Sequence, residues 1–306
     1  MALPVFAAID IGTNTVLLVV AERGADGRFT PLVERAEITR LGKGVDASGL
    51  LQAENITRTA DVVGRFATEA RKLGAKQIAC VATSAARDAK NGSEFFNAIA
   101  QHAQLEPEII SGDDEAQFAY LAAERDFGSG AKVVIDIGGG STEFVFGTNG
   151  RVAFRRSFDL GSVRLTERHV KHDPPTNSER DAVQSELDRA FAALPAREPN
   201  AEVVGVAGTA TNVFTVERGV HPYDASRAHG QLLSRGEVES CAERLWSLRV
   251  DDRKKLPGMV AERADVLATG AMILARALAA LDAAAVRISD RGVRWGLLYA
   301  RFGEAA

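Results

Sequence analysis

Short runs of apolar, β-branched residues alternate along the chain with longer segments in which apolar side chains recur at helical spacing. The helical spacing marks residues 50–73, 93–103, 111–127, 178–194, 234–248, 264–281 and 291–302, and a further helix is expected from Thr209. The apolar runs between them predict strands at residues 77–82, 105–110, 202–206 and 285–288. Helices that alternate with strands in this way predict an α/β fold in which helices cover the sheet faces.

One four-residue pattern, Ile-Asp-Ile-Gly, occurs at residues 9–12 and again, 126 positions later, at residues 135–138. Each copy ends an apolar run, is followed by small or hydroxyl residues, and leads into a second apolar run. An Asp-Gly pair at residues 26–27 and an Asn-Gly pair at residues 149–150 are hairpin signals, so a third strand is expected in each copy. The sequence therefore predicts one strand–turn–strand unit that is used twice.

Two related halves predict a central cleft, with the two Asp-Ile-Gly turns facing each other across it. The expected domains are residues 1–128 and 129–306, because the glycine-containing segment 128–130 directly precedes the second copy. A last helix, at about residues 291–303, can pack back on the first domain. The length of 306 residues agrees with two domains at about 150 residues each.

The charge balance narrows the class of partner. The chain has 41 acidic and 37 basic side chains and a formal net charge of -4, which argues against general nucleic-acid binding.

A content of 46% hydrophobic residues excludes a mainly disordered chain. The two cysteines, Cys80 and Cys241, form neither a disulfide framework nor a zinc site and are expected to be buried.

The apolar segments do not predict export or membrane insertion. Residues 3–9 have no basic segment before them and no cleavage pattern after them. Residues 271–286 are interrupted by Arg276 and Asp282 and are too few to cross a bilayer. We therefore expect a cytoplasmic protein without a membrane partner.

Three glycine-bearing turns are candidates for phosphate binding, because successive amide groups and hydroxyls can surround an anion. Two of them follow the acids Asp10 and Asp136, and the third links a strand to a helix, whose N-terminus also favours an anion. The same residue types also occur in ordinary tight hairpins, so each turn alone is ambiguous. The candidate phosphate-binding residues in these turns are Gly12, Thr13, Asn14, Thr15, Gly138, Gly139, Gly140, Ser141, Thr142, Gly208 and Thr209.

Two charged residues outside these turns are further candidates. Arg87 follows a buried strand, where its guanidinium could meet phosphate oxygens or could form a surface ion pair. Glu115 lies in the first turn of a helix, where acids complement the helix dipole and where Ser111 and Asp114 form a capping-box pattern. Glu115 also shares a helix face with Phe118, and a carboxylate on an apolar face can serve as a general base.

Other catalytic arrangements find little support. The five histidines have no metal-ligand spacing and are expected at the surface or in local hydrogen bonds, and there is no Gly-x-Ser-x-Gly nucleophile elbow.

Several basic residues could continue a path for a polyanion, and we expect them to cluster: Arg40, Lys43, Arg87, Lys254 and Lys255.

Over nearly its whole length, the chain resembles the exopolyphosphatase and guanosine pentaphosphate phosphohydrolase family of the actin, hexokinase and sugar-kinase superfamily. The resemblance rests on residues 9–15, 82–89, 110–116, 134–143, 159–165, 206–210, 223–230, 256–265 and 289–292. It implies two related ribonuclease H-like (actin-like) domains around a central cleft, and Mg²⁺-dependent release of a terminal phosphate from inorganic polyphosphate or guanosine pentaphosphate.

The resemblance also assigns roles to residues. It implies that Glu115 is the catalytic base and that Asp136 and Glu143 organise the metal and the attacking water, with Asp10 as a further metal ligand. Arg87 and the glycine turns would hold the terminal phosphates.

Two features depart from the family pattern. Many relatives carry an additional helical domain beyond the position of Phe302, and an acid often stands where this chain has Trp295. We expect polyphosphate as the substrate, since family members without the extra domain need only a terminal phosphate, and guanosine pentaphosphate is the alternative. A superfamily kinase and a non-catalytic sensor of polyphosphate or guanosine pentaphosphate are the competing classes, and a homodimer is the default assembly.

Overall fold

The repeated apolar runs form the central strands of two mixed sheets in a computed structural model, which describes residues 3–222 and 224–303. The chain divides into two compact units. Unit 1 runs to Ala122 and resumes at Val293, and unit 2 is Ala123–Gly292. The division lies inside helix α5 (Gly112–Phe127), whereas residue 128, the expected boundary, follows that helix.

Unit 1 is built on a five-stranded sheet in the order β3-β2-β1-β4-β5. The first three strands pair antiparallel, and β1, β4 and β5 pair parallel. Their bounds are β1 (Val5–Ile11), β2 (Thr15–Arg23), β3 (Phe29–Ile38), β4 (Ala75–Ala82) and β5 (Glu108–Ile109). The predicted strand at residues 105–110 is thus reduced to two residues.

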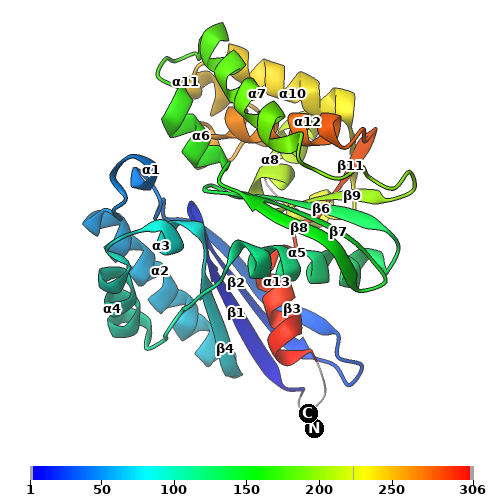
Figure 1. Cartoon of the computed structure of the whole chain (residues 1–306). Coiled ribbons are helices and arrows are strands. Elements are labelled where there is room, and N and C mark those ends of the chain that lie inside the picture. Colours follow the sequence, from blue (N-terminus) through cyan, green and yellow to red (C-terminus); the bar gives the residue numbers. More distant parts are fainter. Residues whose placement is uncertain (1–2, 223, 304–306) are drawn as a thin grey trace. The chain divides into compact units, whose positions relative to one another are not determined.

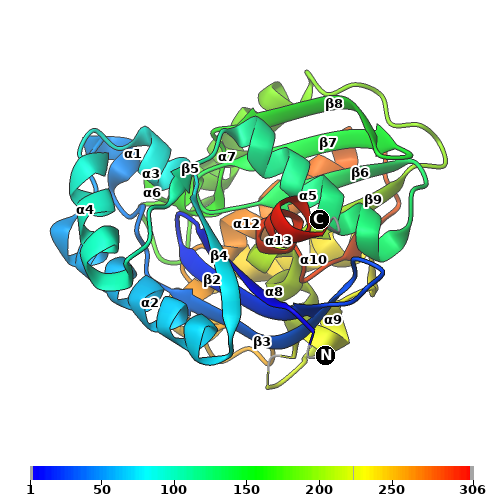
Figure 2. The same cartoon turned by 90° about the horizontal axis from the view of Figure 1, so that it is seen from below.

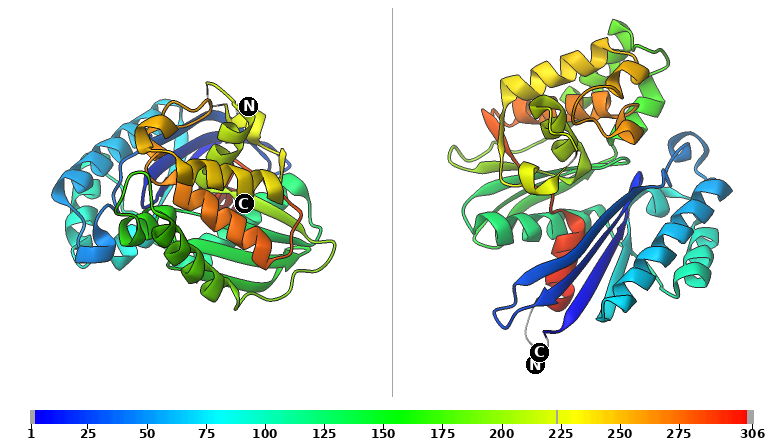
Figure 3. Two further views of the ribbon diagram at one scale, coloured as in Figure 1. Left: turned by 90° about the horizontal axis from the view of Figure 1, so that it is seen from above. Right: turned by 180° about the vertical axis from the view of Figure 1, so that it is seen from behind.

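Alternate residues of β1 point to opposite faces of this sheet, as the pleat requires. Ala7, Ile9 and Ile11 pack in one core with residues of α2 and α4. Phe6 and Ala8 pack in another core with residues of α13, so this last helix covers the opposite face (Figures 1 and 3). The helices of this unit besides α5 are α1 (Val45–Ser48), α2 (Ala53–Lys72), α3 (Ser84–Asp88), α4 (Gly92–Ala103) and α13 (Val293–Phe302).

Unit 2 is built on a six-stranded sheet in the order β10-β11-β9-β6-β7-β8. The strands β6, β7 and β8 pair antiparallel, and β6, β9 and β11 pair parallel, as can be followed for most of them in Figure 2. Their bounds are β6 (Lys132–Ile137), β7 (Thr142–Thr148), β8 (Arg151–Phe158), β9 (Glu202–Val206), β10 (Leu232–Ser234) and β11 (Ala285–Ile288).

Helices bury one face of the second sheet, because Val133, Ile135 and Ile137 share a core with residues of α7, α8, α10 and α12. The helices α10 and α12 lie side by side in this layer (Figure 3, left). The helical segments are α6 (Ser162–His169), α7 (Asn177–Phe191), α8 (Ala207–Arg218), α9 (Ala225–Ala228), α10 (Arg235–Ser247), α11 (Val250–Arg253), the 3₁₀ helix η1 (Ala261–Arg263) and α12 (Leu267–Ala280).

The two sheets repeat one topology. Read from the third strand of each unit, β3-β2-β1-β4-β5 corresponds to β8-β7-β6-β9-β11 in both order and direction, with β10 added at the edge. This is the ribonuclease H-like arrangement, and it confirms the expected α/β fold class and the reuse of one strand–turn–strand unit.

Capping side chains start several helices where the sequence indicates them. Ser111 and Asp114 exchange hydrogen bonds before α5, with 3.1 Å from the Asp114 amide to the Ser111 hydroxyl, which confirms the predicted capping box. Complete capping boxes also precede α7, at Thr176 and Glu179, and α10, at Ser234. Helix α6 was not expected from the sequence, because its eight residues are too few for a clear apolar period.

Both cysteines are buried and free, as expected. Among the described residues, no helix is both long enough and apolar enough to cross a membrane.

Candidate functional site

The first repeated turn closes between β1 and β2. The amide of Gly12 donates a hydrogen bond of 3.0 Å to the carbonyl of Thr15, and the side chains of Thr13 and Thr15 are buried. Asp10, two residues before Gly12, lies on the sheet face opposite that of Ile9 and Ile11. The predicted group Gly12, Thr13, Asn14 and Thr15 is therefore a compact turn at the carboxyl end of β1.

Asp10 is a buried carboxylate of unit 1 with a strongly raised pKa. It is 7% exposed, and burial raises its pKa to about 7, although Arg294 on α13 opposes that shift. Within the described residues, its Oδ1 atom has no hydrogen-bond partner. A buried carboxylate oxygen without a donor is a suitable acceptor for a cation or for the water around one.

Glu115 and Arg87 lie close together in unit 1. Glu115 lies in the first turn of α5 and is only 7% exposed, and its Oε2 atom is 3.7 Å from Nη1 of Arg87. Arg87 ends helix α3, and the same Nη1 atom donates to the carbonyl of Ile110 at 2.9 Å. The Ile110 carbonyl thus holds the guanidinium beside the carboxylate.

The second repeated turn closes between β6 and β7 in the same way, with 3.0 Å from the Gly138 amide to the Ser141 carbonyl. Asp136 and Glu143 are directly opposite each other in the β6–β7 pair and are 5% and 1% exposed. The hydroxyl of Ser157 on β8 donates to Oε1 of Glu143 at 2.6 Å. The sequence did not indicate Ser157, because only strand register places it beside Glu143.

The start of α6 presses against the second turn. A Cβ atom at Gly161 would lie 2.2 Å from the Gly139 carbonyl oxygen, so only glycine fits there. The hydroxyl of Thr142 donates a hydrogen bond of 2.6 Å to the carbonyl of Leu160, so this hydroxyl proton is already used within the protein. Within the part of the chain that the structure describes, the amides of Gly139, Gly140 and Ser141 donate to no protein acceptor, so these N–H groups can serve a ligand.

The third turn joins β9 to α8. The hydroxyl of Thr209 donates to the Ile137 carbonyl at 2.9 Å, which ties this turn to the end of β6. The Arg263 guanidinium lies against Gly208, where a Cβ atom would be 2.1 Å from Nη1. Ala207 has a φ of 67°, in the left-handed region that a residue with a side chain rarely adopts. Neither Arg263 nor Ala207 was singled out by sequence reasoning.

The acids fit the expected Mg²⁺. Mg²⁺ is usually held by one or two carboxylates together with waters and substrate phosphates. Asp136 and Glu143 offer two carboxylates in one row of the second sheet, and Asp10 offers a buried oxygen in unit 1. Across residues 3–222 and 224–303, no three His, Cys, Asp or Glu side chains converge into a metal cage.

The basic residues and the histidines serve mainly local contacts. Lys254 and Lys255 pair with Asp251 and Asp252 on the same helical turn, at 2.9 Å and 2.8 Å, so their charge is neutralised locally. Four of the five histidines lie within 4 Å of a carboxylate, as expected for local hydrogen-bonding groups: His102, His169, His172 and His229. The expected polyanion path through Arg40, Lys43 and Arg87 stays a prediction.

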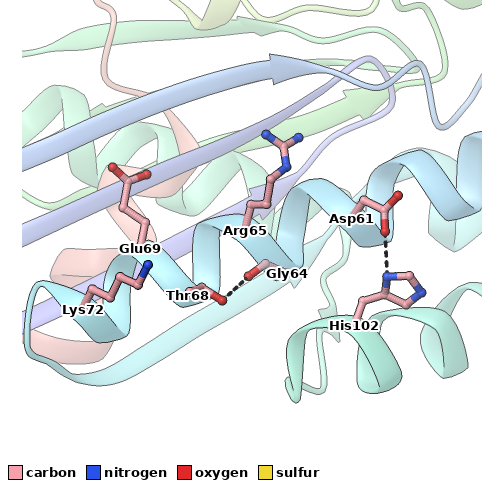
Figure 4. A pocket seen from close by; sticks show the side chains of 7 residues that line it. All are labelled: Asp61, Gly64, Arg65, Thr68, Glu69, Lys72 and His102. Carbon is pink, nitrogen blue, oxygen red and sulfur yellow. Dashed lines mark hydrogen bonds and ion pairs between the residues drawn. The ribbon is translucent and has the colours of Figure 1, made fainter.

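A surface hollow in unit 1 is separate from all of these groups. It lies between α2 and α4 and includes Asp61 and His102, whose atoms approach to 2.7 Å (Figure 4). Arg65 pairs with Glu37, and Glu69 pairs with Arg35, each at 2.7 Å. None of its lining residues belongs to the predicted site. Ion pairs of this kind are typical of a protein surface in contact with solvent.

Comparison with known proteins identifies the family. A model of the Ppx/GppA phosphatase family matches residues 19–304. The chain belongs to the Ppx/GppA phosphatase family. This confirms the family resemblance and the expected enzyme class, a hydrolase that acts on phosphoanhydride bonds.

Relatives cover most of the chain. Exopolyphosphatase 2 of Mycobacterium tuberculosis is 37% identical in an alignment of 288 residues that covers 90% of this chain and 90% of that protein. Guanosine-5′-triphosphate,3′-diphosphate pyrophosphatase of Vibrio atlanticus is 28% identical, with 98% of this chain and 60% of that protein covered. The crystal structure of the Aquifex aeolicus Ppx/GppA member has a TM-score of 0.83 at 31% identity, with 98% and 97% of the two chains covered.

Trp295, which stands where the family resemblance leads us to expect an acid, is fully buried in this chain. Its Nε1 donates to Oε2 of Glu34 at 3.0 Å, and Nη2 of Arg294 donates to the same oxygen at 2.6 Å. The carboxylate that pairs with Arg294 therefore comes from β3. Trp295 contributes to packing in the α13 core of unit 1.

Proposed function

We propose that the protein is an exopolyphosphatase, which removes the terminal phosphate of inorganic polyphosphate with Mg²⁺ as its metal. The observation that carries this proposal is the buried pair Asp136 and Glu143, beside a glycine turn whose amide groups are available to an anion. The similarity to exopolyphosphatase 2 over 90% of both chains supports polyphosphate as the substrate class.

The substrate phosphates would be bound mainly by backbone amides and by Arg87. Residues 12–15 and 138–142 form the two turns, and Gly208 and Thr209 form the third. The guanidinium of Arg87 could contact phosphate oxygens and would at the same time remain near Glu115. Positioning and charge neutralisation are the main contributions a protein makes to phosphoryl transfer.

Glu115 is proposed as the general base. It would accept a proton from a water molecule whose oxygen forms the new bond to the terminal phosphorus. The bridging P–O bond then breaks, and the electron pair of that bond leaves with the shortened polyphosphate. The first-turn position of Glu115 and its contact with Arg87 support this role, because both hold the carboxylate in one orientation.

Asp136, Glu143 and Asp10 are the proposed metal ligands. When bound, Mg²⁺ would neutralise the charge that develops on the phosphate oxygens. Ser157 keeps the Glu143 carboxylate in a fixed orientation by its hydrogen bond to Oε1. The position of Asp136 directly opposite Glu143 supports the assignment, since Mg²⁺ is usually held by one or two carboxylates together with waters and substrate phosphates.

Hydrolysis of guanosine pentaphosphate is the second candidate, and the Vibrio atlanticus relative supports it. Both substrates end in a phosphoanhydride-linked phosphate, so the same residues could serve either. A cytoplasmic location and a homodimer remain part of the proposal.

Phosphate release tests the proposal directly. The substrates are polyphosphates of several lengths, guanosine pentaphosphate and ATP, each with and without Mg²⁺. We expect Mg²⁺-dependent release from polyphosphate at a higher kcat/KM than from guanosine pentaphosphate. Release mainly from guanosine pentaphosphate would favour the second candidate, release mainly from ATP would favour a different phosphohydrolase, and binding without release would indicate a sensor.

A further inference from the structure

The two repeated turns are held by donors from the segment that follows the third strand of each sheet. In unit 1, the carbonyl of Thr13 accepts from the Gly42 amide at 2.8 Å. The carbonyl of Asn14 accepts from two amides, those of Thr39 and Arg40, both at 3.0 Å. Backbone amides therefore hold these two carbonyls.

The positions 126 residues later are Gly139 and Gly140. The Gly139 carbonyl again accepts from backbone amides, those of Val163 at 2.9 Å and Arg164 at 3.0 Å. The Gly140 carbonyl instead accepts from Nε of the Arg164 side chain at 2.7 Å. One side chain in unit 2 thus occupies the place that two backbone amides occupy in unit 1.

The hydrogen bond from Arg164 also determines where an amide points. The carbonyl of Gly140 and the N–H of Ser141 belong to one planar trans peptide, so they point in opposite directions. Holding the carbonyl toward α6 directs the Ser141 N–H away from α6. The same geometry applies to the Gly139 N–H, because the Gly138 carbonyl accepts from the Ser162 amide at 3.0 Å.

Glycine makes such a restraint necessary. Gly139 and Gly140 have no side chain to limit their dihedral angles, so this peptide could rotate more freely than its neighbours. Ser141 is 2% exposed and its peptide follows Gly140, so the Arg164 bond supplies the side-chain restraint on this group.

We propose that Arg164 is a positioning residue that aims the amide of Ser141 at the substrate phosphate by holding the carbonyl of Gly140. This inference rests on the proposed function, in which residues 138–142 bind phosphate. It assigns the effect to the Nε–H donor, and the positive charge of Arg164 is not required.

Three substitutions separate the donor from the charge. Arg164→Gln places an amide nitrogen the same number of bonds from Cα as Nε and removes the charge. Arg164→Met has similar length and no donor. Arg164→Lys keeps the charge but moves the donor one bond further out. Arg168→Met is the matched control, because Arg168 is an exposed arginine on the same helix, one turn later.

The measurements are kcat and KM for phosphate release from polyphosphate, and calorimetric binding of tripolyphosphate without metal. We expect Arg164→Met to raise KM and the tripolyphosphate Kd about five- to tenfold with kcat within twofold, as for loss of one hydrogen bond used in binding. Arg164→Gln and Arg168→Met should remain within twofold of the wild type, and Arg164→Lys should resemble Arg164→Met.

The inference would be overturned if all four variants behaved like the wild type. It would also be overturned if Arg164→Lys kept wild-type binding and Arg164→Gln lost it. If Arg164→Met does not fold, the comparison of Gln with Lys decides between donor and charge. The proposed function is tested separately by the wild type. Tripolyphosphate binding with the predicted variant order, but without hydrolysis, would refute the exopolyphosphatase and leave the role of Arg164 supported.

Discussion

The Ser157 hydroxyl donates a hydrogen bond of 2.6 Å to Oε1 of Glu143, from the neighbouring strand of the second sheet. A hydroxyl that donates to a buried carboxylate stabilises its charged form and restricts its rotation. Ser157 is therefore the contact through which β8 orients a proposed metal ligand.

Ser157→Ala should lower kcat about tenfold, because Glu143 loses a charge-assisted hydrogen bond. The concentration of Mg²⁺ that gives half-maximal activity should also rise. Steady-state kinetics over a Mg²⁺ titration measures both quantities. Ser185→Ala on the exposed face of α7 is the control, and identical titrations for the two variants would show that Ser157 does not act on Glu143.

Glu115→Gln should leave the fold intact and slow hydrolysis by about 10²–10⁴, because an amide cannot accept the proton of the attacking water. Single-turnover phosphate release measures the chemical step. Asp113→Asn, an exposed acid in the same helical turn, should keep full activity. Near-normal turnover by Glu115→Gln would remove Glu115 from the role of base.

Asp136→Ala should abolish Mg²⁺-dependent activity, because it removes one of two paired carboxylates in unit 2. The check is a metal titration of phosphate release, beside Asp159→Asn as an exposed control in the same unit. A titration curve equal to that of the wild type would exclude Asp136 as a metal ligand.

The burial of Asp10 predicts a pH-dependent stability in metal-free buffer. Its pKa is raised from 3.8 to about 7 in the folded protein, so between these values the native state holds more protons than the unfolded chain. The free energy of unfolding should therefore fall as pH rises from about 4 to 7 and change little from this group above pH 7. Loss of the whole contribution is on the order of 2–4 kcal/mol.

Asp10→Asn should remove this part of the pH dependence, since an amide does not titrate. Urea unfolding at pH 5 and pH 8 should show the variant gaining stability relative to the wild type at the higher pH. Asp26→Asn, in the exposed β2–β3 hairpin turn, serves as the control. Parallel pH profiles for the wild type and Asp10→Asn would contradict the prediction.

Two helical glycines should respond to alanine with opposite signs. A Cβ atom at Gly296 in α13 would lie 1.8 Å from the Phe118 carbonyl oxygen, so Gly296→Ala should destabilise unit 1 by about 3 kcal/mol or more. A Cβ atom at exposed Gly236 in α10 would meet nothing within 4 Å, so Gly236→Ala should stabilise by about 0.5 kcal/mol. Chemical denaturation measures both, and equal effects would show that the close approach at Gly296 is relaxed at little cost.

The sequence predicted, through its internal repeat, that one strand–turn–strand unit is used twice, and the two sheets confirm this. The copies at residues 9–12 and 135–138 share their local hydrogen bonding, because a short turn between paired strands is specified by its own residues. The amphipathic helices followed from apolar spacing for the same reason. Helix α6 escaped prediction, since its eight residues make only about two helical turns. Of the strand expected at residues 105–110, only Glu108–Ile109 forms.

The candidate site, like the fold, could be predicted from the sequence only in part. Asp10, Asp136 and the turn glycines were visible because they are adjacent in sequence to a repeated pattern. Glu115 was ambiguous between an acid that complements the helix dipole and a general base, and only the folded chain shows its contact with Arg87. The roles of all these residues in catalysis stay predictions.

By itself, the sequence determined the repeated unit, its acids and its glycine turns, because these depend on neighbours within a few residues. Only the tertiary structure decided which partners hold these groups, such as Ser157 on Glu143 and Arg164 on Gly140. It also decided where distant helices meet, as Phe118 and Gly296 do. Strand register and helix packing bring these pairs together from 14 to 178 residues apart, and the period of a single strand or helix carries no information about its partner's register.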